Sequence, residues 1–174
     1  QEELEQETRE AREAELNALD KQLVNDRDPR TQEALRDLRT LVEAFTDRQA
    51  WKESITALST FELLSTVDGI FDKCVESLKI TLKQHDLSRK AASEKIKKSI
   101  LERRDGVIKG VQEGVSKLNE TLGDFQELSV TGDKDAKLSQ LGEELNSQLD
   151  IMKRVDERMN SIGSENDYSE FDSD

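Results

Sequence analysis

The chain contains one cysteine, Cys74, and one histidine, His85, the two side chains with the widest chemical repertoire. Cys74 lies between the apolar residues Phe71 and Leu78, so we expect a buried thiol. A zinc site needs several Cys or His ligands. A di-iron helical bundle needs Glu-x-x-His pairs, whereas Leu82 stands three residues before His85. The sequence therefore predicts no catalytic residue, no metal site and no cofactor.

Three glycines, Gly106, Gly110 and Gly114, recur at four-residue steps within a periodic apolar stretch. Each glycine inside a helix costs about 1 kcal/mol relative to alanine. Glycine at this spacing lets another helix approach closely, so we expect a close crossing here, within the fold or in a dimer. The alternative is that the glycines only loosen the helix. A phosphate-binding loop would also need a strand before it and a Lys-Ser/Thr ending.

Charge is distributed unevenly along the chain. The net charge is −13, which argues against general affinity for nucleic acid or anionic membrane. Residues 1–28 carry −6, whereas residues 79–104 carry nine basic and three acidic side chains, a balance of +6. No aromatic side chain in that stretch could stack on a base. We expect a solvated face that complements the acidic segments, and the alternative is a site for nucleic acid or anionic lipid.

The elements that must position these residues are long amphipathic helices. After Pro29 the chain runs 145 residues without proline, while apolar residues recur at three- and four-residue steps. Only 33% of residues are hydrophobic and 4% aromatic, so the core must be narrow. No stretch approaches the eighteen apolar residues of a membrane-spanning helix. We therefore predict an all-α fold, an elongated antiparallel bundle or coiled coil of four to five helices.

Local signals place the helix boundaries. Asp28 is suited to cap a helix whose first residue is Pro29, and Gly163 is suited to end one. Residues 86–88 indicate a turn, residues 129–133 a clear break, and residues 50–60 a kink or short break. The sequence predicts a single domain, 1–162, with a stripe from Ile96 to Phe125 buried. Its expected helices are 2–25, 29–50, 60–85, 88–128 and 134–162, and an acidic tail occupies 163–174.

The segment 134–162 has the most regular heptad pattern in the chain. We call its two repeating positions the seam and expect them to contact a partner helix. Gln148 is polar, and a polar seam residue fixes register at a cost in stability. The first seam position holds Leu138, Leu145, Met152 and Met159, and the second holds Leu141, Gln148, Val155 and Ile162.

The string from Leu141 to Gln148, LGEELNSQ, resembles the central part of a glutamine-type SNARE helix. In that family a glutamine interrupts the apolar layers of a four-helix bundle. The resemblance implies that Gln148 forms the central polar layer and that the partners act in membrane fusion. It covers residues 138–162, and Thr131-Gly132-Asp133 departs from the pattern where the family's helix should continue.

The sequence as a whole predicts a non-enzymatic helical interaction or scaffold module. Its single cysteine favours a reducing, intracellular compartment. The chain begins at Gln1 rather than at methionine, so we expect a fragment of a longer protein. We expect it to be cytoplasmic, either free or as the cytoplasmic part of a membrane-anchored protein, with a protein partner or self-association through its helices. The alternative function is a membrane-linked regulator or SNARE-like assembly factor that uses helix 138–162.

Overall fold

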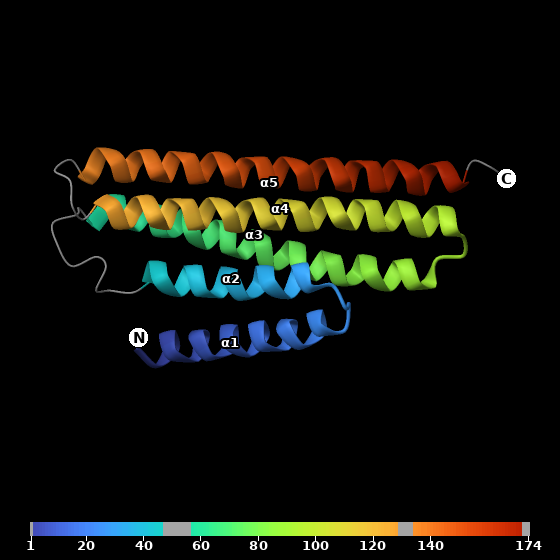
Figure 1. Ribbon diagram of the computed structural model, residues 1–174, viewed down its shortest axis with the longest axis horizontal. Coiled ribbons are helices and arrows are strands. Elements are labelled where there is room, and N and C mark those ends of the chain that lie inside the picture. Colours follow the sequence, from blue (N-terminus) through green and yellow to red (C-terminus); the bar gives the residue numbers. More distant parts are fainter. Residues whose placement is uncertain (1, 47–56, 129–133, 172–174) are drawn as a thin grey trace.

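The computed structural model is an all-helical bundle of five helices that pack against one another (Figure 1). The structure describes residues 2–46, 57–128 and 134–171, although the side chains of 57–59, 134–135 and 156–171 lie outside this description. The predicted fold class is confirmed. The helices are α1 (Glu2–Val24), α2 (Pro29–Thr46), α3 (Ala57–Lys90), α4 (Glu94–Glu127) and α5 (Lys134–Phe171).

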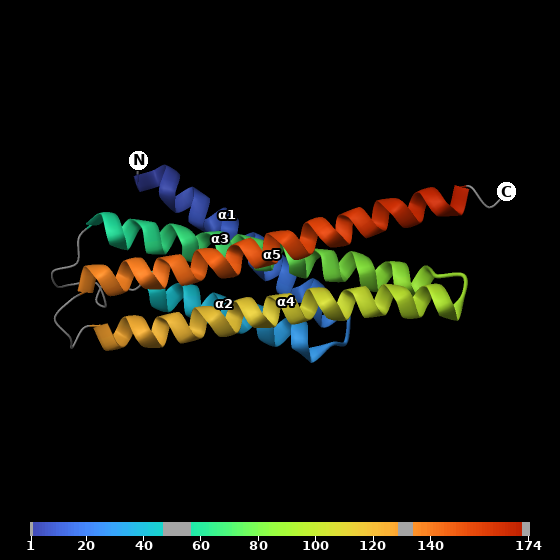
Figure 2. The same ribbon diagram turned by 90° about the horizontal axis from the view of Figure 1, so that it is seen from above.

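An antiparallel hairpin of α3 and α4 forms the centre of the bundle (Figures 1 and 2). Helix α5 packs against both members of this hairpin, and α2 also packs against both. Helix α1 contacts α2 and α3 from the outside. No described helix has the length and apolar character needed to cross a membrane.

The core is a narrow column of aliphatic side chains between these helices, as the low apolar content predicts. Leu38 of α2, Ile70 of α3, Leu118 of α4 and Leu145 of α5 are all fully buried. Near one end of the column the rings of Phe45 and Phe125 lie 6.4 Å apart between their centroids. Helix α1 contributes three buried leucines, Leu16, Leu19 and Leu23, while its first ten residues are exposed.

The start of α2 has the predicted caps. Asp28 Oδ1 accepts a hydrogen bond of 3.1 Å from the backbone N–H of Arg30, and Pro29 is the first helical residue. The preceding Arg27 has a φ of 57°, which turns the chain sharply between α1 and α2. The described part of α2 ends at Thr46, and most of the break expected at 50–60 lies outside the described residues.

The boundary between α3 and α4 differs from the prediction. Helix α3 continues through 86–88 to Lys90, because the Ser88 hydroxyl donates to the carbonyl of His85 in its own helix rather than capping a new one. The turn falls at 91–93. There Ser93 Oγ accepts a 3.2 Å hydrogen bond from the N–H of Ile96 and caps α4.

The end of α5 also differs from the prediction. The helix does not stop at 162 but runs on to Phe171, so most of the expected acidic tail is helical. A glycine that ends a helix does so in the left-handed conformation. No described glycine has a positive φ, so Gly163 is an interior residue of α5.

Candidate functional site

The first seam position of α5 points into the bundle. Leu138 and Leu145 are fully buried and Met152 is 6% exposed, and all three belong to the core. Leu141 of the second position is also buried. The structure therefore brings the first half of the predicted seam against α3 and α4.

The second seam position turns away from the core along the helix. Gln148 is half-buried and Val155 is 39% exposed, while Leu149 packs against the core instead. A strict seven-residue repeat drifts about 20° per heptad around a straight helix, so its later members leave the buried face. The side chains of Met159 and Ile162 lie outside the described residues.

The three predicted close-packing glycines have different surroundings. A Cβ atom added at Gly114 would lie 3.1 Å from Cys74 Sγ of α3 and 3.2 Å from Met152 Sδ of α5, so three helices converge there. A Cβ at Gly110 would meet nothing within 4 Å, and Gly110 is therefore no close-packing position within this chain. Gly106 is half-buried.

A further close approach was not foreseen from the sequence. A Cβ added at Gly69 of α3 would lie 3.0 Å from Leu149 Cδ2 of α5. Gly69 is isolated in a helical stretch, and this was the available signal, because an interior glycine usually has a packing reason. Leu149 approaches the α3 backbone at this point.

A buried ionic cluster around Arg104 is the feature that the sequence analysis missed. The Arg104 side chain is 5% exposed, and its guanidinium donates to Asp26 Oδ2 at 2.8 Å and to Asp28 Oδ2 at 2.9 Å. Its Nε donates to the carbonyl of Thr81 at 3.2 Å. Arg104 thus fastens the α1–α2 loop and α3 to α4.

Neighbouring groups complete the cluster. Arg30 donates to Asp28 at 2.7 Å and to the exposed Asp105 at 2.9 Å, and the buried Thr31 hydroxyl donates to Asp26 at 2.9 Å. Hydrogen bonds from Arg30, and secondarily from Arg104, hold the pKa of Asp28 far below its usual value despite partial burial. We call this cluster the Arg104 clasp. Its charged groups form ion pairs and hydrogen bonds with one another, which indicates a structural role.

The basic stretch 79–104 divides into two groups. Lys79 pairs with Glu15 of α1, and Arg104 pairs with the α1–α2 loop but is buried rather than on the expected solvated face. The hydrogen bond and the charge of Lys79 lower the pKa of Glu15. The other seven cations form no ion pair within the described part of the chain: Lys83, Arg89, Lys90, Lys95, Lys97, Lys98 and Arg103.

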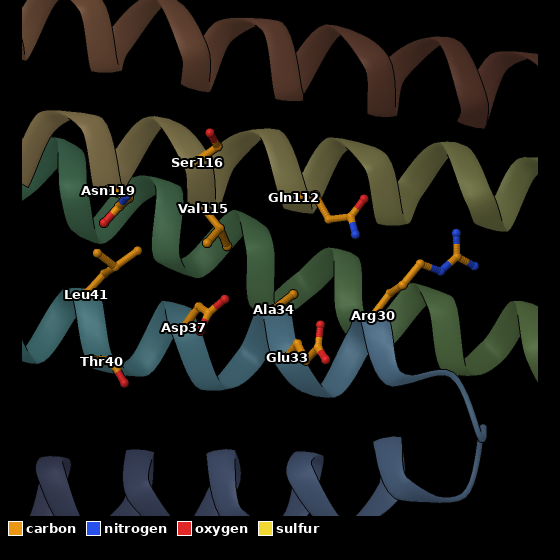
Figure 3. A pocket seen from close by; sticks show the side chains of 10 residues that line it. All are labelled: Arg30, Glu33, Ala34, Asp37, Thr40, Leu41, Gln112, Val115, Ser116 and Asn119. Atoms are coloured by element: carbon orange, nitrogen blue, oxygen red, sulfur yellow. The ribbon is translucent and has the colours of Figure 1, made fainter.

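The surface also contains an open groove between α2 and α4, with a cavity volume of about 510 Å³. Ala34, Leu41 and Val115 form its apolar part, and its polar lining includes charged side chains of α2 and the amides of Gln112 and Asn119 on α4 (Figure 3). The lining residues are Arg30, Glu33, Ala34, Asp37, Thr40, Leu41, Gln112, Val115, Ser116 and Asn119. This lining includes no cysteine or histidine, so it offers neither of those nucleophiles.

Reactive and metal-binding groups are dispersed in the described residues. No three His, Cys, Asp or Glu side chains there form a group that could hold a metal ion. Cys74 is buried as predicted, and burial raises the pKa of its thiol to about 12. At neutral pH the thiol is therefore protonated and inaccessible, which is typical of a structural cysteine.

No protein-family model, curated protein or solved structure matches this chain.

Proposed function

We propose that this chain is a non-enzymatic, intracellular helical interaction module that pairs through the second half of α5. The observation that carries the proposal is the change in exposure along α5. Leu138, Leu141, Leu145 and Met152 are buried, whereas Ile151, next to Met152, is 49% exposed and Val155 is 39% exposed. Beyond them the helix continues to Phe171.

The backbone arrangement supports this assignment. Residues 153–171 span about 28 Å at 1.5 Å per helical residue. In the view of Figure 2 this part of α5 diverges from α4 towards the C-terminal end. The second half of α5 is thus an arm with less cover from the central hairpin than the first half.

The sequence of the arm continues an apolar stripe. Ile151, Val155, Met159 and Ile162 are spaced i, i+4, i+8 and i+11, which places them on one face of a straight helix. The segment 151–162 has three basic and two acidic side chains, a balance of +1. Two copies of this segment therefore repel each other little. The chain as a whole carries −13, so pairing through most of the other surfaces would meet stronger charge repulsion. We propose a second copy of α5 as the occupant of the stripe.

The buried thiol and the absence of a metal-binding group among the described residues are consistent with this function. A lone reduced cysteine is typical of proteins in a reducing compartment. The groove between α2 and α4 is a second surface where a partner could bind, but half of its lining is charged or amide-bearing. The apolar stripe of α5 is the stronger candidate, because three of its four residues, Val155, Met159 and Ile162, occupy seam positions of the heptad pattern.

The test is size-exclusion chromatography with light scattering over a range of protein concentrations. We expect the unmodified chain to form a dimer at high concentration. A double variant, Ile151→Glu with Val155→Glu, should be monomeric. The matched control, Ser139→Glu with Ser147→Glu, adds the same charge at exposed positions of α5 and should dimerise normally. A chain that stays monomeric at every concentration, or equal loss in both variants, would overturn the proposal.

A further inference from the structure

The end of the α3–α4 hairpin has a composition unlike the rest of the molecule. We call residues 82–103 the hairpin tip. It carries seven basic and three acidic side chains, a balance of +4, so the remainder of the chain carries −17. None of the seven cations forms an ion pair with a described residue, as noted above. The tip is therefore a concentrated, unneutralised positive region on an acidic protein.

The tip lies at one extremity of the long axis. The loop between α1 and α2 stops well short of it, so neither of those helices covers the tip (Figures 1 and 2). Within the tip only Ser88 is buried. The cations are distributed over both helices and both sides of the turn at 91–93, and of the other helices only the C-terminal part of α5 extends as far as this end of the hairpin (Figures 1 and 2).

Two apolar side chains are exposed among these cations. Leu87 precedes the turn and is 57% exposed, and Ile96 follows it and is 43% exposed. Leu87 lies between Lys83 and Lys90 at steps of four and three residues, on one face of α3. Basic side chains around exposed aliphatic ones are the composition of segments that lie in the interface of an anionic membrane.

We propose that the hairpin tip docks end-on to an anionic lipid surface. This inference goes beyond pairing through α5 and does not depend on it. Lipid headgroups would meet the lysines and arginines of the tip, while Leu87 and Ile96 would enter the headgroup region. Helix α1, with eight acidic and three basic side chains, stops well short of the tip and is repelled by the same surface, which favours an end-on orientation.

A lipid surface fits the tip better than the other anionic partners do. The tip contains no Phe, Tyr or Trp on which a base could stack. Three grooves on the surface, one between α2 and α4, one between α4 and α5 and one beside α1, are lined by residues outside 82–103. A cationic hairpin end with exposed aliphatic residues is suited to a broad, flat and hydrated surface.

The test is co-sedimentation of the full chain with vesicles of phosphatidylcholine alone and with 30% phosphatidylserine. We expect binding to the anionic vesicles only, weakened by salt. Each Lys or Arg near such a surface contributes about fivefold to binding. Lys95→Glu with Lys98→Glu should therefore weaken binding by at least tenfold. The control, Lys109→Glu with Lys153→Glu, makes the same charge change at exposed lysines outside the tip and should change it less than twofold.

A second pair of variants separates the apolar contribution. Leu87→Ser with Ile96→Ser should weaken binding severalfold, whereas Leu4→Ser with Phe61→Ser, at exposed positions outside the tip, should not. Circular dichroism confirms that each variant is helical. Lack of binding to anionic vesicles, or equal losses in tip and control variants, would overturn the proposal. Tighter binding of the unmodified chain to a single-stranded RNA or to polyglutamate than to the vesicles would overturn the lipid assignment.

Discussion

The same two helices form both the best-packed part of this molecule and one of its more exposed parts. In one part, α3 buries a side chain at almost every turn from Leu63 to Thr81, and α4 does so from Arg104 to Phe125. In the hairpin tip only Ser88 is buried. Both parts are continuous helix, so helix formation and core formation are separate properties of this chain. In proteins most helical stability comes from packing rather than from propensity, and we therefore expect the two parts to differ in stability.

The Arg104 clasp lies at the border between the two parts. Of the substitutions considered, those that break it should lower the free energy of unfolding most. Arg104→Ala leaves the fully buried carboxylate of Asp26 without its charged partner. Removing one member of a buried ion pair costs about 3–5 kcal/mol. Urea unfolding followed by circular dichroism measures the loss. Arg103→Ala, one residue away in the tip, is the control and should change the free energy of unfolding by less than about 0.5 kcal/mol.

Within the packed part, Leu145→Ala should be the next most damaging change. Leu145 is fully buried among α3, α4 and α5, and such truncations cost about 2–5 kcal/mol. Val155→Ala, ten residues later on the same helix, should cost less than about 0.5 kcal/mol, because Val155 is 39% exposed. Equal losses in urea melts would mean that the exposed arm of α5 is also part of the core.

Acid should weaken the clasp through Asp28. Its folded pKa lies below the unfolded value of about 3.9, so it contributes stability above that value and loses it as the pH falls further. Asp28→Asn keeps a good helix cap but removes the charge, and should cost about 1–3 kcal/mol at pH 7. Urea melts from pH 7 to pH 2 should show the gap between the two proteins narrowing below pH 4. A gap that stays constant would show that Asp28 is not the titrating group.

Substitutions at two glycines of α4, Gly110 and Gly114, should change the stability least, and by different amounts. Gly110→Ala adds a methyl group in open space and should stabilise by about 0.5–1 kcal/mol through helix propensity. At Gly114 the added Cβ would press on Cys74 and Met152, which offsets part or all of that gain. Thermal melts of the two variants compare them directly. The same gain at both positions would remove the evidence for a close three-helix crossing.

Sequence patterns alone predicted much of this fold. The 3.6-residue apolar period predicted five helices and an all-α bundle, and Asp28-Pro29 predicted the start of α2, because these signals are local. The extent of burial was not predictable in the same way. Ile96 continues the apolar period of α4 but is 43% exposed, and α2 stops short of this end of α4 (Figures 1 and 2). Exposure there depends on where α2 and α5 lie, which no local pattern records.

For Arg104 the prediction failed in the opposite direction, because an exposed residue was expected and a buried one is found. It was grouped with a solvated basic stretch, yet it stands on the apolar stripe between Ile100 and Val107, and that spacing indicated burial. Its partners Asp26 and Asp28 are 78 and 76 residues away in the chain, so only the tertiary fold reveals the pairing. Four residues of the predicted seam of α5, Leu138, Leu141, Leu145 and Met152, are buried within this chain. Beyond it the heptad drifts around a straight helix, and Val155 is exposed.

Native-state hydrogen exchange of the full chain tests the central contrast most directly. Amides of α3 between 63 and 81 and of α4 between 107 and 125 should exchange only through global unfolding, since they belong to the packed part. Amides of the hairpin tip should exchange at least tenfold faster, through local opening that leaves the core intact. Protection in the tip equal to that at Val111 and Leu118 would contradict the account, because it would show that the tip and the core unfold as one unit.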